Sequence, residues 1–173
     1  MIILITGATH TGKTALALKM IARYGYPCLS LDWLKMGLIR AGYTELTPYD
    51  DEALTGYLWP VAREMIKTAI ENGQDMIVEG CYIPFGWRRD FDGRYLPSVR
   101  YICLAMTDGY IDAHSGDITA HASDAEARLE DDINVERLKA DNRAYIEGCA
   151  AAGESVVLIE DDYEQTIERI LEL

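Results

Sequence analysis

The feature that most constrains this chain is a strand, a glycine-bounded loop and a helix in immediate succession at its start. Residues 2–6 are the apolar run IILIT, and residues 7–14 read GATHTGKT, a full match to the pattern G-x-x-x-x-G-K-[S/T]. The following segment, ALALKM, has helical composition. A buried strand that leads through such a loop into a helix points backbone N–H groups at an anion. The sequence therefore predicts a phosphate-binding loop.

Individual residues of this loop have predicted roles. Gly7 and Gly12 allow the backbone to turn with its N–H groups facing inward. Lys13 is expected to reach the β- and γ-phosphates of a nucleotide, and the Thr14 hydroxyl is expected to bind Mg²⁺. The other loop residues predicted to line the phosphates are Thr9, His10 and Thr11. His10 occupies a variable position of the pattern, so its side chain is expected to point away from the phosphates. The alternative is a coincidental glycine turn, against which the flanking strand and helix argue.

Length and composition favour a single domain over residues 1–173, because one core of this size is common. No apolar run approaches the 18 or more residues that a membrane span needs, and no basic segment precedes the first strand. The four cysteines are widely spaced, with no C-x-x-C pair. We therefore expect a cytoplasmic protein with reduced thiols and no membrane partner. The Tyr and Trp residues form no contiguous stripe, so no oligomeric state is predicted.

The net charge of −13 is concentrated in the last third of the chain. Residues 1–105 contain 11 basic and 11 acidic residues, whereas residues 106–173 contain 5 basic and 18 acidic ones. A chain this acidic would repel a phosphate backbone, so we expect no nucleic-acid partner. The simplest interpretation of the acidic third is a solubilising helical surface.

Short apolar runs alternate with helical stretches, which is typical of βαβ units and a parallel sheet. Strands are predicted at residues 2–6, 28–31, 76–78, 99–105 and 155–159. Helices are predicted at about 13–24, 33–41, 48–72, 124–152 and 163–173. The polar segment 107–123 has no convincing period. The fold class is therefore predicted as α/β, a three-layer α/β/α arrangement around a five-stranded parallel sheet.

Two carboxylates end predicted strands, at the edge where doubly wound sheets bind their ligands. Asp32 follows the second strand and is suited to accept a proton from a substrate hydroxyl or to hold a magnesium-bound water. Its alternative or additional role is to cap the helix that starts near Trp33. Glu79 ends the third strand, where an acid beside a phosphate-binding loop binds metal or substrate. An acid that merely ends the strand is the alternative.

Arginines form two further groups of candidates. Arg88 and Arg89 lie in an aromatic-rich segment, 85–94, and their planar forks suit a phosphate or carboxylate of a substrate. Equally, this segment is interpretable as a solvated turn whose arginine stems pack on aromatic rings. In the acidic third, Arg128, Arg137 and Arg143 are candidates for a cation that covers the transferring group from a mobile lid. An ordinary intrahelical pair, such as Arg137 with Asp141, is the alternative.

With these residues the chain resembles the P-loop kinases of the nucleoside-monophosphate and small-metabolite group, which includes adenylate, shikimate and gluconate kinases and zeta-toxin-like enzymes. The resemblance rests on the loop 7–14, on Asp32, and on the sequence IVEG that contains Glu79. It implies a sheet order of 2-3-1-4-5, an acceptor region near residues 33–60 and a lid around residues 106–130. It also implies ATP and Mg²⁺ as cofactors, with the adenine near residues 160–162.

Two departures from nucleoside-monophosphate kinases shape the functional prediction. Residues 106–127 contain no arginine, and Asp32 fits kinases that deprotonate a hydroxyl. We therefore expect a kinase that transfers the γ-phosphate of Mg-ATP to a small hydroxylated or phosphorylated metabolite. The catalytic residues would be Lys13, Asp32 and either Arg137 or Arg143. The alternatives are a nucleotide-binding regulatory protein without transfer, and a simple nucleotide hydrolase.

Overall fold

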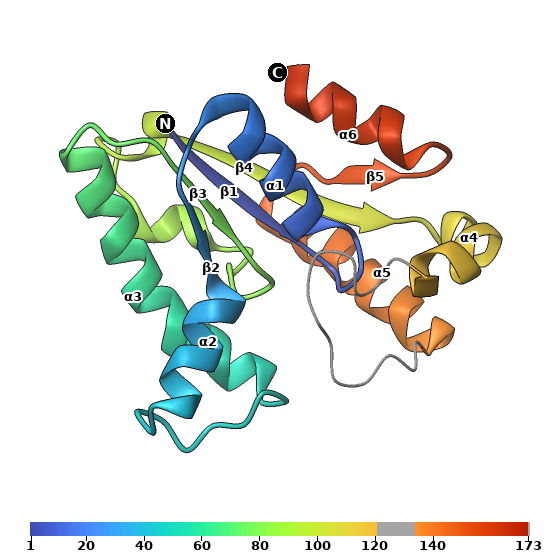
Figure 1. Cartoon of the computed structure of the whole chain (residues 1–173), viewed down its shortest axis with the longest axis horizontal. Coiled ribbons are helices and arrows are strands. Elements are labelled where there is room, and N and C mark those ends of the chain that lie inside the picture. Colours follow the sequence, from blue (N-terminus) through green and yellow to red (C-terminus); the bar gives the residue numbers. More distant parts are fainter. Residues whose placement is uncertain (121–133, 173) are drawn as a thin grey trace.

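A five-stranded parallel sheet forms the centre of the molecule (Figure 1). The structure, a computed structural model, describes residues 1–120 and 134–172. The strands are β1 (Ile2–Gly7), β2 (Cys28–Ser30), β3 (Met76–Glu79), β4 (Val99–Met106) and β5 (Val157–Ile159). Their order is β2-β3-β1-β4-β5, which confirms the predicted order.

Six α-helices and two short 3-10 turns are described around the sheet. They are α1 (Lys13–Tyr24), α2 (Leu31–Arg40), α3 (Asp51–Glu71), α4 (Asp108–Ala120), α5 (Val135–Ala152), α6 (Tyr163–Glu172), η1 (Trp87–Asp90) and η2 (Leu96–Ser98). α2 begins two residues earlier than predicted, because Ser30 ends β2 and directly becomes the N-cap of the helix. Asp32 consequently lies inside the first turn of α2 rather than ahead of it.

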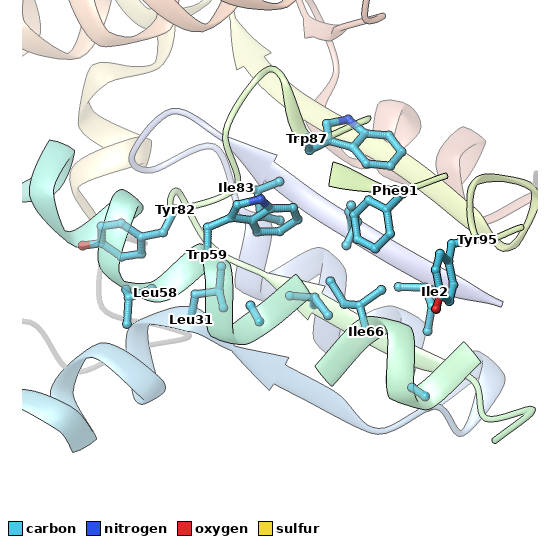
Figure 2. Close-up of a cluster of buried hydrophobic side chains, with 14 of the residues drawn as sticks. Ile2, Leu31, Leu58, Trp59, Ile66, Tyr82, Ile83, Trp87, Phe91 and Tyr95 are labelled. Carbon is cyan, nitrogen blue, oxygen red and sulfur yellow. The ribbon is translucent and has the colours of Figure 1, made fainter. Parts of the chain in front are cut away.

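The alternation of side chains along β1 divides the core into two layers. Ile3 and Ile5 pack with α1 and α6, whereas Ile2 and Leu4 pack with α3 and with the segment after β3. Figure 2 shows the second layer, in which large rings run in a row from Tyr82 towards the start of β1. Both faces of β1 are therefore buried, which explains why its sequence is continuously apolar.

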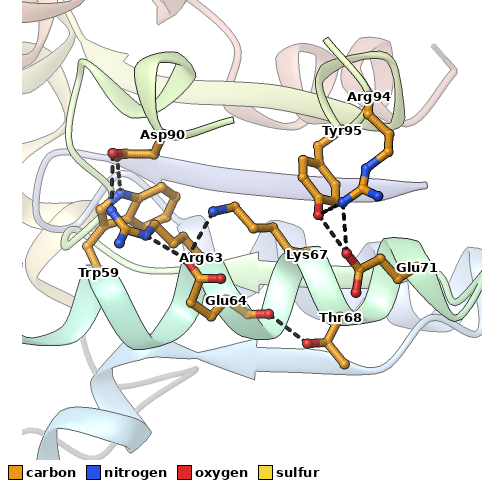
Figure 3. Close-up of polar contacts among 9 residues, drawn as sticks. All are labelled: Trp59, Arg63, Glu64, Lys67, Thr68, Glu71, Asp90, Arg94 and Tyr95. Atoms are coloured by element: carbon orange, nitrogen blue, oxygen red, sulfur yellow. Dashed lines mark hydrogen bonds and ion pairs between the residues drawn. The ribbon is translucent and has the colours of Figure 1, made fainter. Parts of the chain in front are cut away.

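The segment between β3 and β4 is fastened to α3 by polar contacts (Figure 3). Asp90 accepts hydrogen bonds from the indole of Trp59 at 2.7 Å and from Arg63 at 3.2 Å. Further along, Glu71 accepts hydrogen bonds from Tyr95 and Arg94. These contacts hold the segment against the sheet as it returns from the end of β3 to the start of β4.

The polar segment 107–123 forms a helix over most of its length, which the sequence did not predict. α4 spans Asp108–Ala120 and is kinked at His114, whose φ of −121° and ψ of 16° are not helical. The kink shifts the apolar positions out of a single helical period, so no stripe is visible in the sequence. Residues 121–130 of the predicted lid and the first part of the predicted helix 124–152 lie outside the described residues. None of the described helices is long and apolar enough to cross a membrane.

Candidate active site

The carboxyl ends of β1, β2 and β3 meet at one edge of the sheet. Glu79 is in register with Ile5 of β1 on one side and with Ser30 of β2 on the other. The phosphate-binding loop therefore begins beside Glu79, and the first turn of α2 begins on its other flank. This places Asp32, Glu79 and the loop 7–14 at one edge, as the sequence predicted from the parallel arrangement.

The loop is organised around one backbone carbonyl. The Ala8 carbonyl oxygen accepts a hydrogen bond from the buried Thr11 hydroxyl at 2.8 Å and another from the Lys13 ammonium at 2.8 Å. His10 has a φ of 64°, a left-handed conformation that is uncommon for a residue with a side chain. Thr9 and His10 thus form the turn of the loop. The Lys13 ammonium bonds back to Ala8, the residue that precedes this turn.

The two glycines of the loop have no space for a side chain. A Cβ on Gly7 would lie 2.2 Å from the carbonyl oxygen of Leu104 in β4, and backbone in a central strand cannot yield. Gly12 caps α1 with a φ of 79°, and a Cβ there would lie 1.9 Å from the hydroxyl of Tyr163. Close packing and a left-handed backbone therefore both require glycine at position 12.

Thr14 and Glu79 form a pair of oxygen ligands suited to magnesium. The Thr14 hydroxyl donates a hydrogen bond to Glu79 Oε2 at 3.2 Å, and the Glu79 side chain is only 1% exposed. Mg²⁺ prefers hard oxygen ligands and is commonly held by one or two protein groups together with substrate phosphates. Among the described residues, no group of three or more His, Cys, Asp or Glu side chains is placed to hold a metal ion.

Asp32 is paired with a lysine that the sequence analysis did not single out. Lys35 lies one turn along α2, and its ammonium donates to Asp32 Oδ1 at 2.7 Å and to the Tyr82 hydroxyl at 2.9 Å. The Tyr82 hydroxyl in turn donates to Asp51 Oδ1 at 3.1 Å. We call these four residues the acceptor-side cluster: Asp32, Lys35, Asp51 and Tyr82.

Charges of the acceptor-side cluster and of the phosphate-binding loop act on the same thiol, that of Cys81. Burial raises the pKa of the Cys81 thiol; Lys13 of the loop and Lys35 of the cluster lower that pKa, while Asp32 and Asp51 raise it. In the neighbouring strand, the pKa of the Cys28 thiol is raised to about 12, mainly by burial and further by the charge of Glu79.

Sequence reasoning missed three members of this cluster for two different reasons. The i,i+3 spacing of Asp32 and Lys35 on a predicted helix was a usable local signal for an ion pair. Asp51 and Tyr82 offered none, because they are 31 residues apart and meet only through the packing of α3 on the segment after β3.

Arg88 does not lie beside the phosphate-binding loop. Its guanidinium pairs with Glu154, which precedes β5 at the opposite edge of the sheet, and stacks on the Trp87 ring at 4.6 Å. These contacts support the alternative, an arginine stem packed on an aromatic ring, and a substrate role for Arg88 stays a prediction. Arg89, in the same turn η1, is exposed, and its substrate role stays a prediction.

The two arginines of α5 have different surroundings. Arg143 forms an ion pair with Asp108 at the start of α4 and so fastens α5 to α4. Arg137 is exposed, and its backbone N–H donates to the capping side chain of Asn134 at 3.0 Å. Their catalytic roles stay predictions, and Arg128 lies outside the described residues.

Comparison with solved structures identifies the fold. A sugar kinase from Janibacter sp. HTCC2649 matches with a TM-score of 0.58 at 19% identity over 99% of this chain and 92% of that chain. Shikimate kinase from Aquifex aeolicus matches with a TM-score of 0.51 at 12% identity over 99% and 94%. Deoxyadenosine kinase from M. mycoides matches with a TM-score of 0.52 at 18% identity over 99% and 97%.

The chain has the P-loop small-molecule kinase fold. At these identities the likeness establishes the architecture. No model of a protein family and no curated protein matches the sequence.

Proposed function

We propose that this protein is an ATP-dependent kinase that transfers the γ-phosphate of Mg-ATP to a hydroxyl of a small molecule. The observation that carries the proposal is the meeting of two half-sites at one edge of the sheet. The loop 7–14 with Glu79 supplies the phosphate and metal side, and Asp32 with its cluster supplies the acceptor side. Charges of both sides act on the pKa of Cys81.

Each residue has a definite task in this proposal. The N–H groups of the loop and of the α1 N-terminus hold the phosphates, and Lys13 offsets negative charge on the β- and γ-phosphates. Asp32 accepts the proton of the attacking hydroxyl and orients that hydroxyl for in-line transfer. Such positioning and electrostatic stabilisation account for most of the catalysis of phosphoryl transfer.

Thr14 and Glu79 are the residues that would hold Mg²⁺, Thr14 directly through its hydroxyl and Glu79 through its carboxylate. Magnesium, when bound, neutralises charge between the β- and γ-phosphates. Arg137 and Arg143 are proposed to offset charge in the transition state, Arg143 after release of Asp108. The widely spaced cysteines favour action in the cytoplasm.

A transfer assay tests the proposal. The protein is incubated with Mg²⁺, γ-labelled ATP and a panel of small alcohols, and labelled products are separated from labelled phosphate. A labelled acceptor supports the kinase. Labelled free phosphate alone would indicate a hydrolase, and ATP binding without turnover would indicate a regulatory protein; either outcome overturns the proposal.

The variant Asp32→Asn separates the role of the carboxylate from nucleotide binding. We expect single-turnover transfer to fall about 100-fold, at the low end of general-base effects because the transition state of phosphoryl transfer is loose. ATP affinity should stay within about twofold, because Asp32 faces the acceptor side. The matched control is Asp75→Asn, which makes the same change at the opposite end of β3, where Asp75 pairs with the N-terminus. Unchanged transfer in Asp32→Asn would refute the assignment of the base.

A further inference from the structure

We infer that the acceptor is an alcohol without any anionic group, a neutral polyol or an amino alcohol, and not a sugar acid or a phosphate ester. This inference rests on the proposed function and narrows its substrate class. It follows from the hydrogen bonds and charges of the acceptor-side cluster. Carboxylate oxygens of the cluster are available to accept hydrogen bonds from a ligand, whereas its one cation is already paired.

The only lysine of the cluster is already engaged on two sides. Lys35 is 12% exposed at its side chain, and its ammonium is shared between Asp32 Oδ1 and the Tyr82 hydroxyl. The ammonium also lies 5.0 Å from the centre of the Tyr82 ring, a favourable distance for a cation and an aromatic face. An anionic acceptor would have to draw Lys35 away from these partners in order to be neutralised.

Tyr82 is fixed as a hydrogen-bond donor towards Asp51. Its side chain is 2% exposed, and burial, together with the nearby Cys81 and the carboxylates of Asp32 and Asp51, raises its pKa. The phenol therefore stays protonated, accepts from Lys35 and donates to Asp51 Oδ1. The network runs in one direction, from ammonium to phenol to carboxylate.

The carboxylate oxygens that this network does not use favour a ligand with many hydrogen-bond donors. Asp32 and Asp51 each use one carboxylate oxygen within the cluster, and within the described part of the chain their Oδ2 atoms have no hydrogen-bond partner. Ionised carboxylates only accept hydrogen bonds. Hydroxyl and ammonium groups satisfy them, whereas a carboxylate or phosphate of a substrate does not.

The charges around the cluster also disfavour an anionic acceptor. Two carboxylates face one lysine, and α3 begins with Asp51 and Glu52 behind the capping residue Asp50, so the helix N-terminus carries its own anions. Two arginines of the segment 85–94 are paired with other carboxylates: Arg88 with Glu154 and Arg94 with Glu71. Like charges placed together disfavour a wrong partner.

The test compares acceptors that share a carbon skeleton and differ in charge. Sorbitol, glucosamine, gluconate and glucose 6-phosphate form one such set, and glycerol, serinol, glycerate and glycerol phosphate form another. The measured quantity is kcat/KM for transfer from γ-labelled ATP by the full chain. Within the set whose members receive phosphate, we expect kcat/KM of the neutral and amine-bearing compounds to exceed kcat/KM of the anionic ones at least tenfold.

The variant Asp51→Asn ties the preference to the cluster. It removes one negative charge with little change in shape, so the ratio of kcat/KM for anionic over amine-bearing acceptors should rise about tenfold. Glu52→Gln is the matched control, because it removes the same charge from the same turn of α3 and leaves the hydrogen bonds of the cluster intact; its ratio should stay at the wild-type value. Circular dichroism and ATP binding establish that both variants fold.

The outcomes separate this inference from the proposed function. Wild-type protein that prefers gluconate or a phosphate ester overturns the inference and leaves the kinase intact. An equal rise of the ratio in Asp51→Asn and Glu52→Gln also overturns it, because bulk charge would then explain the preference. Absence of transfer to every member of both sets, with ATP bound, overturns the kinase itself and the inference with it.

Discussion

Lys13→Ala should lower single-turnover phosphate transfer by about 1,000-fold or more, the largest catalytic effect that we expect in this chain. The lysine is the cation that the loop places next to its own phosphate-binding N–H groups, held in position by the Ala8 carbonyl. Removal leaves the loop glycines and Thr14 in place, so the protein should fold normally while the charge on the β- and γ-phosphates goes uncompensated.

The measurement is transfer from γ-labelled ATP to an acceptor found with the wild-type protein, together with ATP affinity by calorimetry. Lys19→Ala is the matched control, because Lys19 lies on the same helix but pairs on the surface with Glu164 of α6. We expect Lys19→Ala to transfer phosphate at the wild-type rate. If Lys13→Ala retained more than a tenth of the activity, the loop would not be the site of transfer.

Trp87→Ala should destabilise the protein by about 3–5 kcal/mol, the cost of truncating a fully buried large ring. Trp87 is 0% exposed, stacks on Tyr101 with ring centres 5.5 Å apart and meets Phe91 edge-on at 5.9 Å. Because domains of this kind have only about 5–15 kcal/mol of stability, the loss would be a large share of the total. Urea unfolding followed by far-UV circular dichroism gives the free energy of unfolding without relying on tryptophan fluorescence.

Two further variants sharpen this experiment. Trp33 has the same side chain but is 77% exposed, so Trp33→Ala should change the free energy of unfolding by no more than about 0.5 kcal/mol. The indole N–H of Trp87 is buried and has no hydrogen-bond partner among the described residues, so Trp87→Phe should cost clearly less than Trp87→Ala. Equal unfolding midpoints for Trp87→Ala and Trp33→Ala would contradict the placement of Trp87 in the core.

The part of the site that could be predicted from the sequence is the part encoded locally. The strand, loop and helix of residues 2–24 are contiguous, and their glycines, lysine and threonine stand at fixed spacings. Asp32 and Glu79 could be placed at the same edge because both end apolar runs and parallel strands end together. The structure places both at this edge, with Asp32 in the first turn of α2.

The parts that the sequence did not reveal depend on distant partners. The segment 85–94 left two interpretations open, and the choice for Arg88 depends on Glu154, which lies 66 residues away. α4 was not predicted because its kink at His114 breaks the period of its buried residues Tyr110, Ile111 and Ile118. These pack against Leu138 of α5, a contact that a local sequence pattern does not predict.

By itself, then, the sequence determined the strand, glycine loop and helix of residues 2–24, the parallel sheet and the edge at which the loop meets Asp32 and Glu79, because hydrophobic period and glycine spacing act over a few residues. Tertiary structure alone decided the acceptor side. Asp32 and Lys35 share one helix, but Asp51 and Tyr82 reach them only when α3 and the segment after β3 pack on the sheet. Hydrogen bonds need partners within about 3 Å, and only the folded chain brings such distant residues to that range.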